Sequence, residues 1–158
     1  MSHANQPSLA GLVPADEEQR LMALDYYQVL DSGPEEAFDR ITRLCAELLG
    51  APIAFISLVD RDRLYIKSVC GADLSEVPRE SSLCAYVVGL GQPLIVADAS
   101  VDHRFHAAPT VVGQPHIRFY AAAQLLTPAG LCLGTLGIAD PVPRQILNGT
   151  PEFLQQFA

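Results

Sequence analysis

The sequence has 158 residues, of which 49% are hydrophobic and 18% are charged. This length suits one globular domain with its own core, and the apolar content excludes a disordered acidic tail or a linker. The formal net charge is −8 and Lys67 is the sole lysine, so we expect no nucleic-acid partner and no contact with an anionic membrane surface.

The N-terminal third is acidic and begins with a segment of low complexity. Residues 1–14 are small, polar and interrupted by Pro and Gly, so we expect a flexible leader before a single domain over residues 15–158. Acids followed by apolar residues predict a first helix over residues 15–30, with an apolar stripe on one side. Residues 1–50 hold nine acids and three bases, so most of the net charge lies there.

A second helix has the clearest start and stop signals in the chain. Ser32 stands three residues before Glu35, with Pro34 between them, and this pattern predicts a capping box with Ser32 as the N-cap. Apolar residues then recur at helical spacing. Gly50 ends the helix, and Pro52 prevents its continuation.

Beyond the second helix the apolar pattern becomes that of strands. Strands are predicted at residues 53–59, 64–70, 94–97, 118–126 and 131–139. A short helix is predicted over residues 82–90, and the last residues begin a helix that we expect to be truncated. Strands joined by tight turns imply an antiparallel sheet, so the predicted class is α+β with the early helices covering one face.

Six strings in this order carry a family resemblance. They are LDSGPEEAFD at 30–39, ISLVD at 56–60, PRESSLC at 78–84, DASVDHRF at 98–105, PHIRFYA at 115–121 and LGTLGIAD at 133–140. The chain resembles a GAF domain of the subclass found at the N-terminus of bacterial sensor histidine kinases and diguanylate cyclases. The resemblance covers about residues 17–158.

The resemblance implies a GAF/PAS-like fold: a central antiparallel sheet of five or six strands, helices on one face and a loop-enclosed pocket on the other. It implies a sensory domain that binds a small molecule and relays the signal through terminal helices, which pair in a homodimer. A histidine kinase or diguanylate cyclase module beyond Ala158 is then expected to do the enzymatic work, and this chain itself is not expected to be an enzyme. The alternative is a ligandless dimerisation module.

Three departures from the family bear on the ligand. Cys84 precedes Ala85, whereas bilin-attaching members have a Cys directly before a His, so a covalent chromophore is not expected. The Asn-Lys-Phe-Asp-Glu signature of cyclic-nucleotide-binding members is missing. Gly137 and Ala139 stand where bulkier residues are common, so the pocket is either enlarged or repacked. These observations leave the ligand and any cofactor unidentified.

Polar and aromatic residues after the third strand supply most of the candidate binding groups. Arg118 and Tyr120 share one strand face, where they could hold an anionic or planar ligand. The candidate ligand-binding residues are Arg79, Cys84, Tyr86, Asp98, Arg104, Phe105, Arg118 and Tyr120. The alternative is structural: the arginines pair with Asp98 or Asp102 and hold loops together.

The cysteines and histidines are the residues that could bind a metal ion or react as nucleophiles. The four cysteines contain no C-x-x-C pair and no export signal precedes them, so we expect a reduced, cytoplasmic protein. Cys84 near a helix start and Arg79 is either a reactive thiol or a small buried residue. Free methionine-R-sulfoxide reductases, thiol enzymes of the same family, use cysteines around the third strand, and none lies there. His103 and His106 with Asp102 are too few ligands for structural zinc, so no metal is expected.

Overall fold

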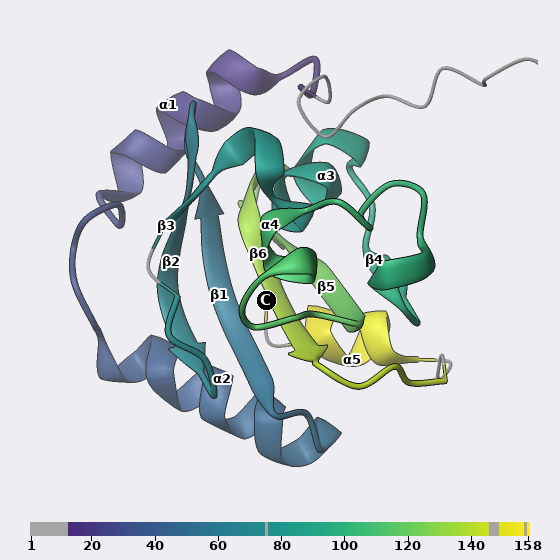
Figure 1. Cartoon of the computed structure of the whole chain (residues 1–158). Coiled ribbons are helices and arrows are strands. Elements are labelled where there is room, and N and C mark those ends of the chain that lie inside the picture. Colours follow the sequence, from purple (N-terminus) through teal and green to yellow (C-terminus); the bar gives the residue numbers. More distant parts are fainter. Residues whose placement is uncertain (1–12, 75, 146–148, 157) are drawn as a thin grey trace, which may run out of the picture.

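Six strands form one antiparallel sheet in the order β3-β2-β1-β6-β5-β4 (Figure 1). The computed structural model describes residues 13–74, 76–145, 149–156 and 158, so nearly all of the expected leader at 1–14 lies outside the described residues. The strands are β1 (Ile53–Val59), β2 (Arg63–Cys70), β3 (Glu76–Pro78), β4 (Leu94–Val96), β5 (Phe119–Leu126) and β6 (Cys132–Asp140). The predicted α+β class is confirmed, with six strands.

Helices lie on both faces of the sheet and at one end of it. They are α1 (Glu17–Tyr27), α2 (Glu36–Leu49), α3 (Leu83–Leu90), α4 (Pro109–Val112) and α5 (Thr150–Gln155), with 3-10 turns η2 (Arg79–Ser81) and η3 (Ala99–Val101). Helices α2 and α5 cover one face, and α3 and α4 lie over the other. Helix α1 crosses the end of the sheet where β1 finishes (Figure 1). No helix in the described ranges combines the length and the apolar content that crossing a bilayer demands.

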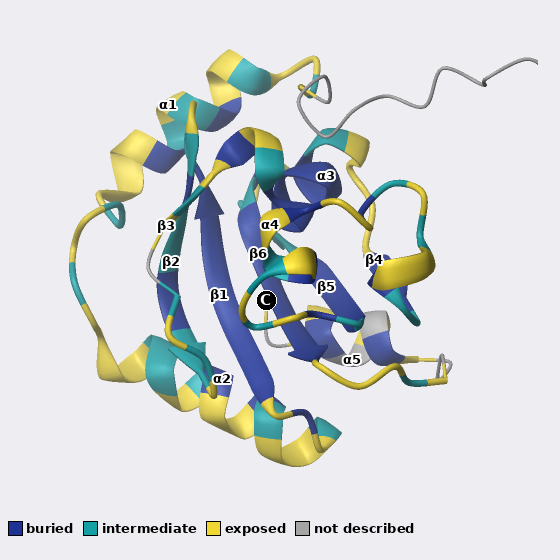
Figure 2. Cartoon of the chain, viewed as in Figure 1, coloured by how far each residue is buried: buried dark blue, intermediate teal, exposed yellow. Residues whose placement is uncertain are grey.

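Strand β1 lies between two apolar cores, and this position explains why its sequence, apart from Ser57, is apolar throughout. Ile53 and Phe55 belong to the core beneath α3, whereas Ala54 and Ile56 belong to the core beneath α2. Successive side chains of a strand point to opposite faces, so a central strand covered on both sides needs apolar residues throughout. Figure 2 shows β1 buried along its whole length.

The predicted capping box before α2 is wrong. The N-cap is Glu35, its backbone is extended, and no side chain caps the helix. Ser32 instead donates a hydrogen bond to the carbonyl of Val29 and accepts one from the buried ammonium of Lys67. Lys67 also forms an ion pair with Glu35 at 2.7 Å. Both side chains of the predicted capping box, Ser32 and Glu35, therefore bind Lys67.

Two segments between the predicted strands and helices contain short elements. Residues 71–81 include β3, which pairs with β2 through Leu64 and Val77. The polar stretch 98–114 includes η3 and α4. Each element spans only three or four residues, so no periodic pattern could identify it.

The predicted apolar stripe of the first helix is not buried. Met22 and Tyr26 are 73% and 82% exposed, whereas Leu24 and, unexpectedly, Arg20 are fully buried. Arg20 donates hydrogen bonds to the carbonyls of Val59 and Cys132. Helix α1 is therefore attached to the sheet by an arginine as well as by apolar packing.

Candidate functional site: a small cavity between the sheet and α3

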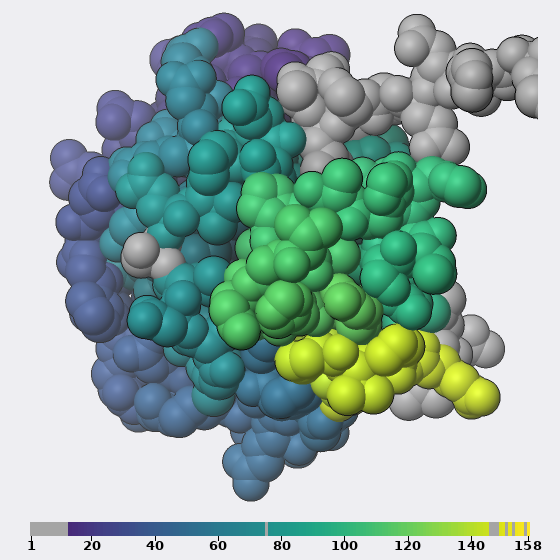
Figure 3. Space-filling model, in the orientation of Figure 1, coloured from purple at the N-terminus to yellow at the C-terminus, as the bar shows by residue number. Residues whose placement is uncertain are grey.

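A cavity of about 40 Å³ lies between the sheet and the layer that contains α3 and α4. Its lining residues include Leu83 and Cys84 of α3, Thr110 of α4, Tyr120 of β5 and Ala139 of β6. In the space-filling view, the green segment with α4 lies against the teal segment with β3 and covers this side (Figure 3). The space is enough for only a few water molecules.

Two polar side chains in contact with each other, Cys84 and Tyr120, belong to the otherwise mostly apolar lining of the cavity. The thiol Sγ of Cys84 lies 3.1 Å from the hydroxyl Oη of Tyr120. Tyr120 also hydrogen-bonds Thr135, whose hydroxyl lies 2.6 Å from that of Ser57. These four side chains are almost fully buried, so they form a chain of hydrogen-bonding groups behind the cavity.

The environment of Tyr120 favours its neutral form. Burial raises the pKa of the Tyr120 phenol well above its usual range, and neighbouring Cys84 raises it further, while the hydrogen bond with Thr135 acts in the opposite direction. Tyr120 therefore offers a neutral hydroxyl group at the cavity. Such a site suits a small, mostly apolar molecule with one polar group.

The structure brings two of the eight candidate binding residues to the cavity, Cys84 and Tyr120. Tyr86 and Phe105 pack edge to face with ring centroids 5.1 Å apart, outside the cavity lining. Arg104 lies over both rings and is held by Asp102 at 2.8 Å. The pairing of Arg104 with Asp102, expected under the structural alternative, is confirmed.

The remaining polar candidates make local contacts around the cavity. Asp98 accepts hydrogen bonds from the amide and hydroxyl of Ser100 and so caps η3. Arg118 donates to the carbonyls of Val111 and Ile117, at 2.9 and 3.0 Å. These bonds hold α4 beside the start of β5.

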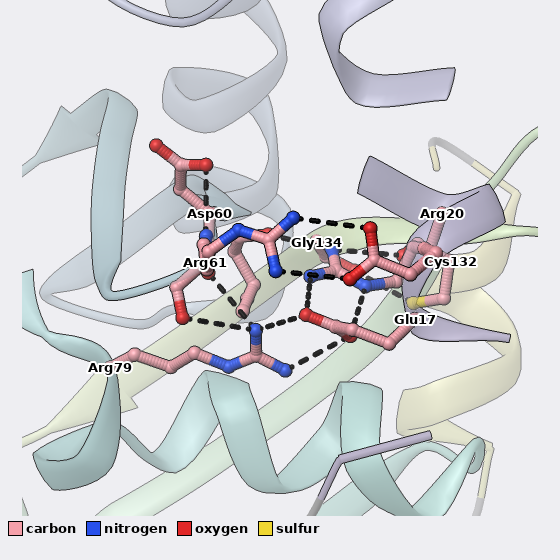
Figure 4. A network of polar contacts seen from close by, with 9 residues as sticks. Glu17, Arg20, Asp60, Arg61, Arg79, Cys132 and Gly134 are labelled. Atoms are coloured by element: carbon pink, nitrogen blue, oxygen red, sulfur yellow. Dashed lines mark hydrogen bonds and ion pairs between the residues drawn. The ribbon is translucent and has the colours of Figure 1, made fainter. Parts of the chain in front are cut away.

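Arg79 points away from the cavity, toward α1. Its guanidinium donates to both carboxylate oxygens of Glu17 and to the carbonyl of Asp60 (Figure 4). Arg20 donates to the same carboxylate at 3.0 Å. Partial burial by itself would raise the pKa of Glu17, but the hydrogen bonds from Arg79 and Arg20 dominate and lower it to about 2.

The two small residues of the last strand have different consequences. A Cβ atom at Gly137 would lie 2.4 Å from the ring of Phe55 and 2.8 Å from the carbonyl oxygen of Ala121, so that space is already filled. Ala139, in contrast, lines the cavity. The space at Gly137 is thus filled by repacking, whereas the small side chain of Ala139 borders the cavity.

The sequence analysis did not select the hydroxyl residues Ser57, Thr110 and Thr135 as site residues. Ser57 and Thr135 are hydroxyl residues inside otherwise apolar strands, and buried hydroxyls need hydrogen-bonding partners. That signal was available in the strings ISLVD and LGTLGIAD. Thr110 belongs to a four-residue helix with no pattern of its own.

Comparison with known proteins gives one close relative by sequence. A family model described as GAF domain matches residues 33–158. The chain is 41% identical over 132 residues to a cyclic di-GMP phosphodiesterase of Pseudomonas aeruginosa, an alignment that covers 83% of this chain. It spans only 22% of that relative's length.

Solved structures agree on the fold. The GAF domain of a phosphoenolpyruvate-protein phosphotransferase from Coxiella burnetii superposes with a TM-score of 0.65 at 14% identity, covering 89% of this chain and 87% of that one. Free methionine-R-sulfoxide reductase from Neisseria meningitidis superposes with a TM-score of 0.63 at 17% identity, covering 89% and 82%. At such identities the likeness establishes the architecture alone.

Proposed function

Because this chain belongs to the GAF domain family, we propose that it is the sensory domain of a longer bacterial signalling protein. In this role it binds a small molecule and passes the signal through its terminal helices, while an output module performs any enzymatic work. The observation that carries the proposal is the cavity beneath α3, with the Cys84–Tyr120 pair in its lining.

The relative from Pseudomonas aeruginosa supports an output linked to cyclic di-GMP. That protein is named as a phosphodiesterase and is several times longer than this chain. The output module of the present protein is proposed to make or degrade cyclic di-GMP. The alternative output module, predicted from the family resemblance, is a histidine kinase. Measuring the activity of the full-length gene product with cyclic di-GMP, GTP and ATP distinguishes these outputs.

The ligand is proposed to be small and mostly apolar, with one group that hydrogen-bonds the Cys84–Tyr120 pair. A screen of such fragments by thermal unfolding is expected to find compounds that raise the midpoint temperature of this chain. Replacing Ala139 by Val adds two carbons to the lining of a 40 Å³ cavity and is expected to abolish that rise. Ala107→Val makes the same change at an exposed position and should keep it. A compound whose effect survives Ala139→Val binds elsewhere.

A ligandless dimerisation module remains the second candidate, and the small size of the cavity favours it. Under either candidate, two copies are proposed to pair through their terminal helices, because Met22 and Tyr26 expose apolar surface on α1. Absence of any binding fragment together with a stable dimer would select the ligandless candidate.

The homodimer gives a separate prediction. Changing Tyr26 to Glu places a charge in the proposed interface, so the mass measured by light scattering after size-exclusion chromatography should fall from two chains to one. Gln114→Glu adds a negative charge at an exposed position outside the terminal helices and serves as the control, which should stay dimeric. A wild-type chain that elutes only as a monomer contradicts the prediction.

A further inference from the structure

The segment that follows β2 faces the cavity at its two ends and faces α1 in between. Val77 lies on one side of η2 and Ser82, Leu83 and Cys84 on the other, and all four line the cavity. Arg79, in η2 itself, extends its side chain away from the cavity toward α1 (Figure 4). One short segment is thus both a wall of the cavity and a contact of the N-terminal helix.

The contact of Arg79 with α1 is buried and has several bonds. Its guanidinium binds Glu17 through two nitrogens, and the side chains of Arg79 and Glu17 are only 10% and 13% exposed. The guanidinium also donates to the carbonyl of Asp60 at 3.1 Å, and the amide of Arg79 donates to the carbonyl of Asp62 at 3.1 Å. Arg79 therefore joins three parts of the chain: η2, the β1–β2 turn and the first residue of α1.

A second ion pair between this region and α1 differs from the Arg79–Glu17 pair in being exposed to solvent. Arg61 of the same turn pairs with Glu18 of the same helix at 3.0 Å, but these side chains are 60% and 70% exposed. Water can replace either partner of the exposed pair at little cost, whereas separating the buried pair would leave the Arg79 guanidinium inside the protein without its carboxylate. Helix α1 must therefore follow Arg79 when η2 moves, while the Arg61–Glu18 pair imposes no such constraint.

From this geometry we infer that Arg79 couples occupancy of the cavity to the position of α1. The inference rests on the proposed sensory function and identifies the route that leads to the N-terminal helix. A ligand larger than the 40 Å³ cavity is expected to push its lining outward, and the residues on either side of η2 form part of that lining. Displacing η2 moves Arg79, and Glu17 carries the motion into α1.

The test fills the cavity chemically at Cys84. In a background where Cys70 and Cys132, which are more exposed than Cys84, are both replaced by Ser, methyl methanethiosulfonate is used to place a methylthio group on Cys84, with methanesulfinate leaving, and dithiothreitol removes it. Mass spectrometry verifies that one group is added, and Cys84→Ser serves as the unmodified control. Hydrogen–deuterium exchange over peptides spanning 13–30 then reports on α1. In the parent, modification is expected to speed exchange of α1 at least threefold, and dithiothreitol should reverse the change.

Arg79→Met is expected to remove the response of α1, because the helix no longer follows η2. Arg61→Met, which breaks the exposed pair between the β1–β2 turn and α1, should respond as the parent does. If Arg79→Met does not fold, Arg79→Lys replaces it, since lysine keeps the charge but loses the two-pronged bond, and at most half of the response should remain.

The inference is overturned if α1 responds as strongly in the Arg79 variant as in the parent. This holds for Arg79→Met and, where it is used instead, for Arg79→Lys. A response confined to α5 would also overturn the inference. In that case the proposed sensory function would be kept, with the C-terminal helix relaying the signal. The fragment screen tests ligand binding separately, so failure of the proposed function and failure of the coupling give different results.

Discussion

Replacing Arg20 by Met is expected to lower the free energy of unfolding by about 3–5 kcal/mol, the range measured when one partner of a buried charged network is removed. The side chain of Arg20 is fully buried on α1 and donates to the carbonyl of Val59 at 2.6 Å and, more weakly, to that of Cys132 at 3.4 Å. Methionine fills similar space but leaves both carbonyls without this donor. Urea unfolding followed by circular dichroism measures the loss.

Two further variants separate charge from geometry at this position. Arg20→Lys keeps the positive charge but has one nitrogen in place of the three with which Arg20 reaches Glu17 and the carbonyl of Val59, so an intermediate loss is expected. Arg61→Met removes an exposed arginine that also contacts α1 and should leave the unfolding midpoint unchanged. A loss below about 1 kcal/mol in Arg20→Met would show that water or rearrangement replaces these bonds.

The second large effect is a dependence of stability on acid that originates in Glu17. Hydrogen bonds from Arg79 and Arg20 outweigh the effect of burial and lower the pKa of Glu17 from 4.5 to about 2 in the folded chain. Since the folded value is the lower one, the stabilisation is complete above pH 5 and is lost as the pH falls toward 2. Linkage gives a loss of about 2 kcal/mol by pH 3 from this carboxylate.

Glu17→Gln isolates this contribution from that of the other acids. The variant is less stable than the wild type at pH 7, and the difference between them should shrink by about 2 kcal/mol at pH 3. Glu18→Gln removes an exposed carboxylate one position away and should retain the acid dependence of the wild type. Parallel stability curves for the wild type and Glu17→Gln between pH 7 and pH 3 would contradict the prediction.

Local patterns were sufficient for most of the fold. The predicted strand at 53–59 coincides with β1, and Gly50 and Gly91 adopt the left-handed conformation at the ends of α2 and α3. These features depend on neighbouring residues, through the spacing of apolar side chains and the conformational freedom of glycine. The start of α2 was misplaced because the bonds of Lys67 come from another strand, and no local pattern contains them.

The candidate site was only partly predictable for the same reason. Cys84 and Tyr120 were selected as single residues, and the folded chain places their polar atoms 3.1 Å apart across 36 residues of sequence. The structural alternative paired Arg79 with Asp98 or Asp102, whereas the chain pairs it with Glu17. Aspartates nearby in sequence are plausible partners, but the topology of the sheet decides which acid lies within reach.

The sequence by itself determined the α+β class, most strands and the acidic character of the N-terminal helices, because composition, period and turn residues act over short distances. Only the tertiary structure decided which charges are buried and which residues share the cavity. Arg79 meets Glu17 across 62 residues, and Arg20 meets the carbonyl of Cys132 across 112. Burial is a property of packed elements, so a charge that stands alone in the sequence becomes a structural contact only when the sheet has formed around it.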